Sequence, residues 1–323
     1  MKKILSYILL AVLSLSFWSC ENDYEVFDQT PAQRTAQALQ RYKFALQANE
    51  YWVMEYFPDD ELRYGGWVYV VRFDADNRVR AWFEGESFVQ MMDIPQVESE
   101  YAVEFATGPM LKFTTHNDFL HYFSQAGYNG SGYQGWKGDY EFTIMSMSAA
   151  FDEIILRGIK TGNRIRLTPL SGEYTPESYI ASVIADQQAQ SRRSFRVMAN
   201  GEQIATLDRP SAIYLSSFPQ YAASKVWTIH YSYEEPMVDA SGKQLFDAQN
   251  NPVYRTVQVD DPLCVIYLPG NIMKLYAPYT FKGDVVPMLG GQTMQTFQWQ
   301  LGVTSASDSY VCRDSFFDFQ LVP

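Results

Sequence analysis

Residues 51–84, YWVMEYFPDDELRYGGWVYVVRFDADNRVRAWFE, decide the fold class. Within them, the runs 51–57, 67–73 and 79–84 are rich in aromatic and β-branched side chains, which favour β-strands. The segments that connect these runs contain Pro, Gly, Asp and Asn, the residue types that form tight turns. Short strands that follow one another through tight turns predict an antiparallel meander.

The meander continues through the first half of the chain. Further strands are expected at 101–106, 110–115, 141–147, 152–158 and 164–170, with a short helix at 116–125. A sequential series of this length favours a sheet that curls into a lipocalin-like barrel or half-barrel.

The second half predicts a second β domain, either a barrel or a sandwich. It begins with a hairpin at 194–208, whose Asn200-Gly201 pair is a strong signal for a two-residue turn. The polar segment 239–251 has the composition of a long hairpin tip. Other strands are expected at 211–218, 226–233, 252–259, 264–268, 296–303 and 316–322.

Helices flank the predicted sheets. The first spans 31–48, where Thr30 and Gln33 have the spacing of a capping box. The second spans 175–193 and marks the boundary between the halves. The predicted fold class is therefore mainly β, with two or three peripheral helices. The expected division is a signal peptide at 1–19, an acidic tether at 20–30, a helix plus β-meander at 31–193 and a second β domain at 194–323.

The N-terminus predicts export. Lys2 and Lys3 precede an apolar run, residues 4–17, which is short for a membrane span, and Ser19 then precedes Cys20. This order is typical of a bacterial lipoprotein signal, which is cut before Cys20 so that the cysteine carries lipid. The alternative is an ordinary secretory signal in which Cys20 is present by chance.

An acidic cluster follows the lipidation site. Glu21, Asp23 and Glu25 resemble the surface-export signal of Bacteroidales outer-membrane lipoproteins, and they also fit a flexible acidic tether. We therefore expect a mature protein that is anchored in the outer membrane through Cys20 and exposed at the cell surface.

The composition of the chain argues against some partners. It has 25 Lys and Arg residues against 37 Asp and Glu residues, a formal net charge of −12. An acidic chain without basic runs binds nucleic acid poorly, because that affinity comes from neutralising phosphates. No nucleic-acid partner is expected. Apolar residues make up 47% of the chain, which is enough for a packed core.

A glycine-rich loop raises the question of a nucleotide site. Gly130, Gly132 and Gly135 have the spacing G-x-G-x-x-G, but the loop follows a short predicted helix and leads into a strand. A dinucleotide-binding loop instead follows a strand and opens a helix, so that the helix N-terminus meets the pyrophosphate. We therefore expect a flexible turn and no cofactor.

Three aromatic residues of the same loop are candidates for contact with a ligand or partner. Tyr128, Tyr133 and Trp136 can present flat rings to an oligosaccharide or an oligopeptide, because loops often carry function. The alternative is that these rings only cover the end of the barrel.

Other motifs that would carry chemistry are weak. His116 and His121 are five residues apart, on different faces of a helix, whereas zinc motifs favour a spacing of four. The sequence contains no G-x-S-x-G motif. We therefore expect neither a metal nor a recognisable set of catalytic residues. Cys264 and Cys312 form either a disulfide or two free buried thiols, since the sequence does not give the separation of their Cα atoms.

The central third of the chain, residues 99–170, resembles a known family. The resemblance is carried by Gly108-Pro109, by Asn117 with Leu120-His121, by Gly138-Asp139-Tyr140-Glu141-Phe142, and by Ile155-Leu156-Arg157-Gly158 with Gly162-Asn163. These motifs resemble Bacteroidales lipoproteins catalogued as domain of unknown function 4302. The resemblance implies an accessory lipoprotein beside a TonB-dependent transporter and its SusD-like partner, in a SusC/SusD-type uptake system. It implies no catalytic residues.

Together these features favour non-enzymatic capture or docking of oligosaccharide or oligopeptide nutrients at the outer membrane. Two alternatives stay open. One is a secreted hydrolase of glycans or peptides whose active site carries no recognised motif. The other is a structural surface subunit that binds no ligand.

Overall fold

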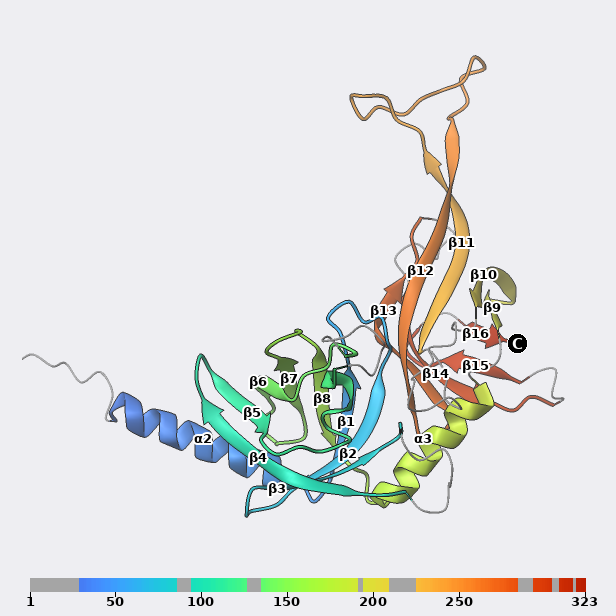
Figure 1. Cartoon of the computed structure of the whole chain (residues 1–323). Coiled ribbons are helices and arrows are strands. Elements are labelled where there is room, and N and C mark those ends of the chain that lie inside the picture. Colours follow the sequence, from blue (N-terminus) through green and yellow to red (C-terminus); the bar gives the residue numbers. More distant parts are fainter. Residues whose placement is uncertain are drawn as a thin grey trace, which may run out of the picture. The chain divides into compact units, whose positions relative to one another are not determined.

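The structure is a computed structural model of the chain. It describes residues 29–85, 94–126, 135–190, 194–208, 225–283, 293–303, 308–315 and 318–323. The strands in these ranges form two closed barrels, each of eight antiparallel strands (Figure 1). By its internal contacts the chain divides into two units, Met1–Arg41 and Tyr42–Pro323, and both barrels lie in the second unit.

The first barrel confirms the predicted meander. Each strand pairs with the next along the chain, and the last strand returns to pair with the first, with Trp52 opposite Pro169. Its strands are β1 (Trp52–Phe57), β2 (Trp67–Phe73), β3 (Arg78–Phe83), β4 (Val97–Phe105), β5 (Pro109–Phe113), β6 (Glu141–Met147), β7 (Ile154–Gly158) and β8 (Arg164–Pro169).

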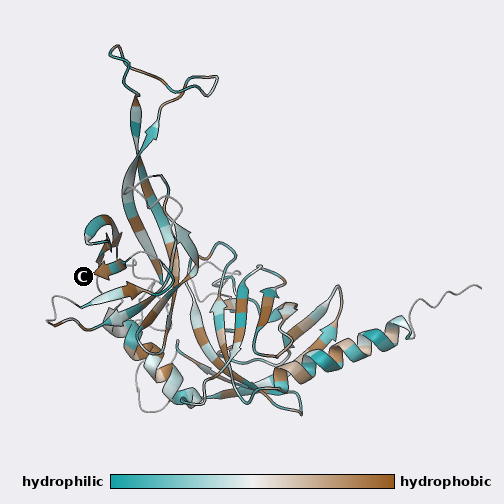
Figure 2. Cartoon of the chain, turned by 180° about the vertical axis from the view of Figure 1, so that it is seen from behind, coloured by the Kyte–Doolittle hydropathy of each residue, from teal (hydrophilic) through white to brown (hydrophobic). Residues whose placement is uncertain are grey.

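Alternation along these strands separates an interior face from an outer face. On β1, Trp52 and Tyr56 lie in the core of the barrel, whereas Val53 and Phe57 belong to a second apolar cluster outside it. Figure 2 shows hydrophobic and hydrophilic bands along the strands. The outer face of β1 is apolar at Val53 and Phe57 because these residues are covered by another part of the protein.

The second half is a barrel rather than a sandwich. Its strands also pair in chain order, and the last strand closes on the first, with Phe319 opposite Ala199. The strands are β9 (Phe195–Ala199), β10 (Glu202–Asp208), β11 (Val226–Pro236), β12 (Tyr254–Leu268), β13 (Ile272–Thr280), β14 (Thr293–Gln300), β15 (Ser309–Cys312) and β16 (Phe319–Val322). The two barrels therefore share one topology.

Three strands of the second barrel, β12, β13 and β15, differ from the prediction, and proline explains the first two differences. Residues 252–259 and 264–268 belong to one long strand, β12, which contains Pro262. Proline fits there because β12 has β13 as a second neighbour only at residues 265–268. No strand was expected at β13, and Pro278 lies within this strand where its pairing with β14 is interrupted. The strand expected at 211–218 lies outside the described residues.

β11 and β12 continue beyond the barrel as a two-stranded ribbon (Figure 1). The ribbon ends in a polar tip held by bridges between Val238 and Gln244 and between Phe246 and Pro252. The hairpin tip predicted at 239–251 is confirmed.

The described residues contain two α-helices. Helix α2 (Pro31–Gln47) begins with the predicted capping box, in which Thr30 N–H donates to Gln33 Oε1 at 2.9 Å and Gln33 N–H donates to Thr30 Oγ1 at 3.3 Å. Helix α3 is Pro176–Gln190. The helix expected at 116–125 is reduced to a 3₁₀ turn, η3 (Tyr122–Ser124). No helix of the described residues is long and apolar enough to cross a membrane.

Helix α3 joins the barrels through apolar contacts. Ile180, Val183 and Ile184 are fully buried, and they share one cluster with Val68 on the outer face of β2 and with Val265 of β12. This cluster contains the core of the second barrel as well, so the outer face of the first barrel and the second barrel form one continuous core.

Backbone and charged groups also join the barrels. Gly66 N–H, before β2, donates to the Val265 carbonyl at 2.9 Å. Gly65 has φ +73°, and a Cβ at this position would lie 2.1 Å from the Cβ of Lys225, so only glycine fits. Lys225 in turn forms an ion pair of 2.5 Å with Glu84, and both side chains are fully buried.

Candidate functional site

A pocket of about 800 Å³ lies where the first barrel meets the second. Its walls are the outer face of β1, β6, β7 and β8 on one side and β13 with β14 on the other. Residues 275–278 of β13 separate it from a smaller pocket of about 350 Å³, which they also line. Pockets of several hundred Å³ are the size that holds small-molecule ligands.

Strand alternation sets which side chains reach the pocket. Ile165 of β8 lies in the core of the first barrel, so its neighbours Arg164 and Arg166 point outward. Arg157 of β7 points outward by the same alternation. The register places Arg157 directly opposite Arg164, and it places Phe57 of β1 on the other side of Arg164. Two arginines therefore stand side by side on the pocket wall.

Glu55 is the one carboxylate among the described residues that line the pocket. Its side chain is only 8% exposed, and Lys274 Nζ lies 3.3 Å from each of its carboxylate oxygens. Arg166 lies 3.6 Å from Glu55 Oε1, and its Nε donates to Glu153 Oε1 at 2.7 Å. The negative charge of Glu55 is thus neutralised within the site.

Arg157 and Arg164 differ from Arg166 in their partners. Neither has a carboxylate oxygen within 4.0 Å among the described residues. Arg164 donates to the Tyr276 hydroxyl, and its guanidinium carbon lies 5.2 Å from the centre of the Tyr276 ring. Like charges directly opposite each other on neighbouring strands are destabilising. The arrangement therefore costs stability when no anion lies beside the two guanidinium groups.

An irregular part of β13 gives the pocket an aromatic wall. β13 pairs with β14 at Ile272–Lys274 and again at Tyr279–Thr280, with a register shift between them. Such a bulge re-aims the side chains of the strand. Tyr276 lies in the shifted segment, and its ring packs edge-on against Phe57 with 4.8 Å between the ring centres.

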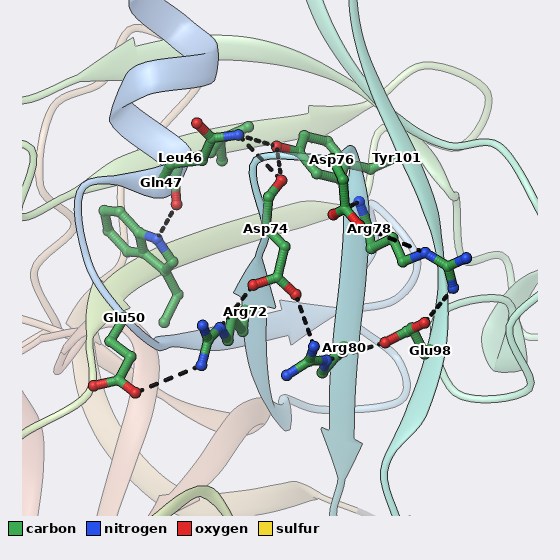
Figure 3. A network of polar contacts seen from close by, with 11 residues as sticks. Leu46, Gln47, Glu50, Arg72, Asp74, Asp76, Arg78, Arg80, Glu98 and Tyr101 are labelled. Atoms are coloured by element: carbon green, nitrogen blue, oxygen red, sulfur yellow. Dashed lines mark hydrogen bonds and ion pairs between the residues drawn. The ribbon is translucent and has the colours of Figure 1, made fainter.

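A second concentration of charge, at the turn between β2 and β3, has a different character (Figure 3). Asp74 accepts a hydrogen bond from Arg72 Nε at 2.8 Å, and Arg80 lies 3.4 Å from its other oxygen. Gln47 of α2 donates to the Asp74 carbonyl at 3.1 Å and to the Tyr101 hydroxyl at 2.8 Å. Because both arginines already have carboxylate partners, this network fastens the end of α2 to the barrel rather than offering an anion site.

Most of the residues predicted from the sequence as functional lie outside the described residues. They are Cys20, Glu21, Asp23, Glu25, Tyr128 and Tyr133. Trp136 is described: it is 6% exposed in the core of the first barrel, and its ring lies edge-on to Tyr64 with 5.0 Å between the ring centres. A ring this deeply buried is not an open platform for a ligand.

Two of the motifs that carry the family resemblance, the one around Asp139 and the one with Gly158 and Asn163, meet at the turn between β7 and β8. Asp139 Oδ2 accepts hydrogen bonds from the backbone N–H groups of Lys160 at 3.0 Å and Thr161 at 2.8 Å. A Cβ at Gly158 would lie 2.2 Å from this Asp139 oxygen and 1.9 Å from Asn163 Oδ1. Burial raises the pKa of Asp139, and the bonds from Thr161 oppose that rise. These residues hold a turn in place, which is a structural role.

The described titratable groups outside the pocket include no cluster that could hold a metal ion, and the two thiols among them are protonated. Within the described ranges, no group of three or more His, Cys, Asp or Glu side chains is placed to hold a metal ion. Cys264 and Cys312 are free thiols. Burial raises the pKa of Cys264 to about 12 and also raises the pKa of Cys312, so both stay protonated at neutral pH. The ring centres of His121 and His116 lie 5.2 Å apart, and burial lowers the pKa of His121.

None of the pocket residues was predicted as functional, although every strand that carries them, except β13, was expected. The alternation Arg164-Ile165-Arg166 was a signal that two arginines share one outer face. The contact between Arg164 and Tyr276 could not be predicted, because the two residues are 112 positions apart in the chain.

Comparison with known proteins gives a family and no activity. No curated protein and no solved structure matches the chain. A family described as a domain of unknown function, DUF4302, matches residues 23–233. The match spans the whole first barrel, α3 and the second barrel as far as β11. Since this is more than half of its length, the chain belongs to the DUF4302 family, a domain of unknown function.

Proposed function

We propose that this protein is a lipid-anchored outer-membrane protein that binds an oligosaccharide or an oligopeptide without turning it over. It would act as an accessory subunit beside a TonB-dependent transporter and a SusD-like protein. The observation that carries the binding part is the pocket of about 800 Å³ between the barrels. Its aromatic wall and its convergent polar side chains are the usual composition of a ligand site.

The position of the pocket supports binding on the outside of the first barrel. The barrel interior is filled by aromatic side chains, among them Trp52, Tyr69 and Phe83. A lipocalin-like topology can enclose a ligand, but this interior is occupied by the protein itself. The outer pocket is therefore the better place for a ligand.

The side chains of the pocket favour binding over hydrolysis. Glycoside hydrolysis generally needs two carboxyl groups that flank the scissile bond. Glu55 is the one carboxylate among the described lining residues, and Lys274 and Arg166 already neutralise it. The buried thiols are also poor nucleophiles, because their pKa values are raised.

Binding can be tested with a steric block and a matched control. Ala277 is exposed on the pocket wall, so Ala277→Trp should fill the pocket, whereas Ala248→Trp places the same ring at the exposed ribbon tip. The mature protein would be titrated calorimetrically with panels of oligosaccharides and oligopeptides. We expect at least one ligand whose binding is lost in Ala277→Trp and kept in Ala248→Trp. Binding of none of them, or release of cleaved products, would contradict the proposal.

The membrane part of the proposal has a separate test. It is supported by the order of residues around Cys20 in the sequence. Cys20→Ala should abolish incorporation of labelled palmitate and move the protein from the membrane to the soluble fraction. Unchanged lipidation would contradict the anchor. Affinity purification from native outer membranes should recover a TonB-dependent transporter or a SusD-like protein, and recovery of neither would contradict the partnership.

A further inference from the structure

The pocket is strongly cationic in an otherwise acidic chain. Among the described residues, its lining contains four cationic side chains, Arg157, Arg164, Arg166 and Lys274, against the single carboxylate of Glu55. The whole chain has a formal net charge of −12. A cleft that concentrates one sign of charge between low-dielectric walls raises the local concentration of ligands of the opposite sign.

The four cations divide into two groups by their partners. Lys274 and Arg166 are held by Glu55, and Arg166 is held by Glu153 as well. Arg157 and Arg164 have no carboxylate within ion-pair distance in the described part of the chain. Their charges are therefore the ones left for a ligand.

The geometry of this second group suits a carboxylate. Directly opposite residues on antiparallel strands have Cβ atoms about 4.5–5.5 Å apart, so both guanidinium groups can reach one small anion. Each guanidinium presents a planar fork of N–H donors that matches the two oxygens of a carboxylate. The Tyr276 hydroxyl accepts a hydrogen bond from Arg164 and so restricts that side chain before a ligand arrives.

We infer that the pocket binds a ligand through a carboxylate group, and that Arg157 and Arg164 hold this carboxylate. The inference rests on the proposed binding function and deepens it. The carboxylate can be supplied by an acidic sugar or by an acidic side chain of a short peptide. Either ligand would place its remaining atoms against Tyr276 and Phe57.

Matched pairs of ligands test the carboxylate directly. The sugar pair is trigalacturonate and its methyl ester, which differ only in the carboxyl groups. The peptide pair is triglutamate and triglutamine, both with an acetylated N-terminus and an amidated C-terminus, so that they differ only in the side-chain carboxyl groups. The inference predicts calorimetric binding of one acidic member, with an affinity at least tenfold above that of its neutral partner and falling as salt is added. The ligand pair whose acidic member binds, sugar or peptide, identifies the source of the carboxylate.

Arginine variants test the two residues. Arg157→Gln and Arg164→Gln should each weaken binding of the acidic ligand roughly ten- to hundredfold, the range expected for lost charge-assisted hydrogen bonds. Arg164→Lys keeps the charge but loses the planar fork of donors, so its affinity should lie between those of the unaltered protein and Arg164→Gln. Arg196→Gln is the matched control, because Arg196 is an exposed arginine on β9 outside the pocket. Its affinity should equal that of the unaltered protein.

The outcomes separate this inference from the proposed function. Equal binding of an acid and its neutral partner, or full affinity in both Arg157→Gln and Arg164→Gln, would overturn the carboxylate inference. The proposed function would survive that result if Ala277→Trp still abolished binding. If no ligand of the wider panels bound at all, the proposed function itself would fail.

Discussion

Replacing Lys225 by Met should remove a large part of the protein's stability, because it leaves a buried charge without its partner. Lys225 and Glu84 are both fully buried, with 2.5 Å between Nζ and Oε1. Lys225 Nζ also lies 4.2 Å from the centre of the Trp67 ring, and Val68 N–H donates to the same Glu84 oxygen at 2.7 Å. Water therefore cannot take the place of the ammonium group without opening the contact between the barrels.

The expected size of the effect follows from this burial. Removing one partner of a buried ion pair costs about 3–5 kcal/mol, against a total stability of about 5–15 kcal/mol for a typical protein. The double variant Lys225→Met/Glu84→Gln buries no charge, and the new amide can still accept the bond from Val68, so it should regain most of the loss. The control Lys282→Met removes an exposed ion pair with Asp261. It should cost at most about 1 kcal/mol.

The pH dependence has a definite sign. Burial raises the pKa of Glu84, and the opposing effect of Lys225 is lost in Lys225→Met. A carboxyl group with a higher pKa in the folded than in the unfolded chain favours folding at low pH, and this advantage disappears as the pH rises through the folded pKa. The deficit of Lys225→Met relative to the unaltered protein should therefore be larger at pH 8 than at pH 5.

Urea unfolding followed by tryptophan fluorescence at the two pH values measures these differences. A loss below about 1 kcal/mol at pH 8, the size of an exposed pair, would refute the reasoning. So would a double variant as unstable as Lys225→Met, or a deficit that is the same at both pH values.

Three further predictions follow from other contacts. Arg157→Gln should raise the free energy of unfolding of the ligand-free protein by about 0.2–1 kcal/mol at low salt, because it relieves a cross-strand repulsion. A lower free energy of unfolding, measured by urea unfolding, would contradict this. Trp136→Ala should cost about 3–5 kcal/mol by the same measurement, whereas a loss under about 0.5 kcal/mol would mean that the ring is not a core residue. Gly158→Ala should lower the thermal midpoint, because the added Cβ would lie 1.9 Å from Asn163 Oδ1. Gly172→Ala should leave the thermal midpoint unchanged, because no atom lies within 4 Å of its added Cβ. Equal midpoints for Gly158→Ala and Gly172→Ala would argue against tight packing at Gly158.

The strands of the first barrel were predictable because the pattern is local. Residues 67–73 and 141–147 were expected as strands with the bounds that the structure has. The sequence did not decide between a closed barrel and a half-barrel, because closure depends on the pairing of Trp52 with Pro169 across the whole domain. No local pattern reports a pairing over that distance.

The errors in the second barrel have a physical cause. Pro262 and Pro278 argue locally against a strand, since proline cannot donate a ladder hydrogen bond. In the structure each lies where its strand is unpaired or irregular on one side, so the missing donor costs little. Which side of a strand is paired is a property of the sheet and not of the sequence window.

The candidate site was the least predictable part. Arg157 and Arg164 read as ordinary exposed strand residues, and an exposed arginine is common. Their significance comes from being opposite each other and facing Tyr276 of the other barrel. The aromatic residues that the sequence favoured included Trp136, which packs inward. Composition indicated that aromatic rings were available, and only the packing of the barrels shows which ones border a pocket.

The central claim is that the pocket between the barrels holds a carboxylate between two arginines. A crystal structure of the protein with trigalacturonate or triglutamate, whichever binds in solution, tests it most directly. We expect a ligand carboxylate within about 2.7–2.9 Å of the guanidinium nitrogens of both Arg157 and Arg164, with the ligand against Tyr276. A ligand bound elsewhere on the protein, or one in the pocket whose carboxylate faces away from both arginines, would contradict it.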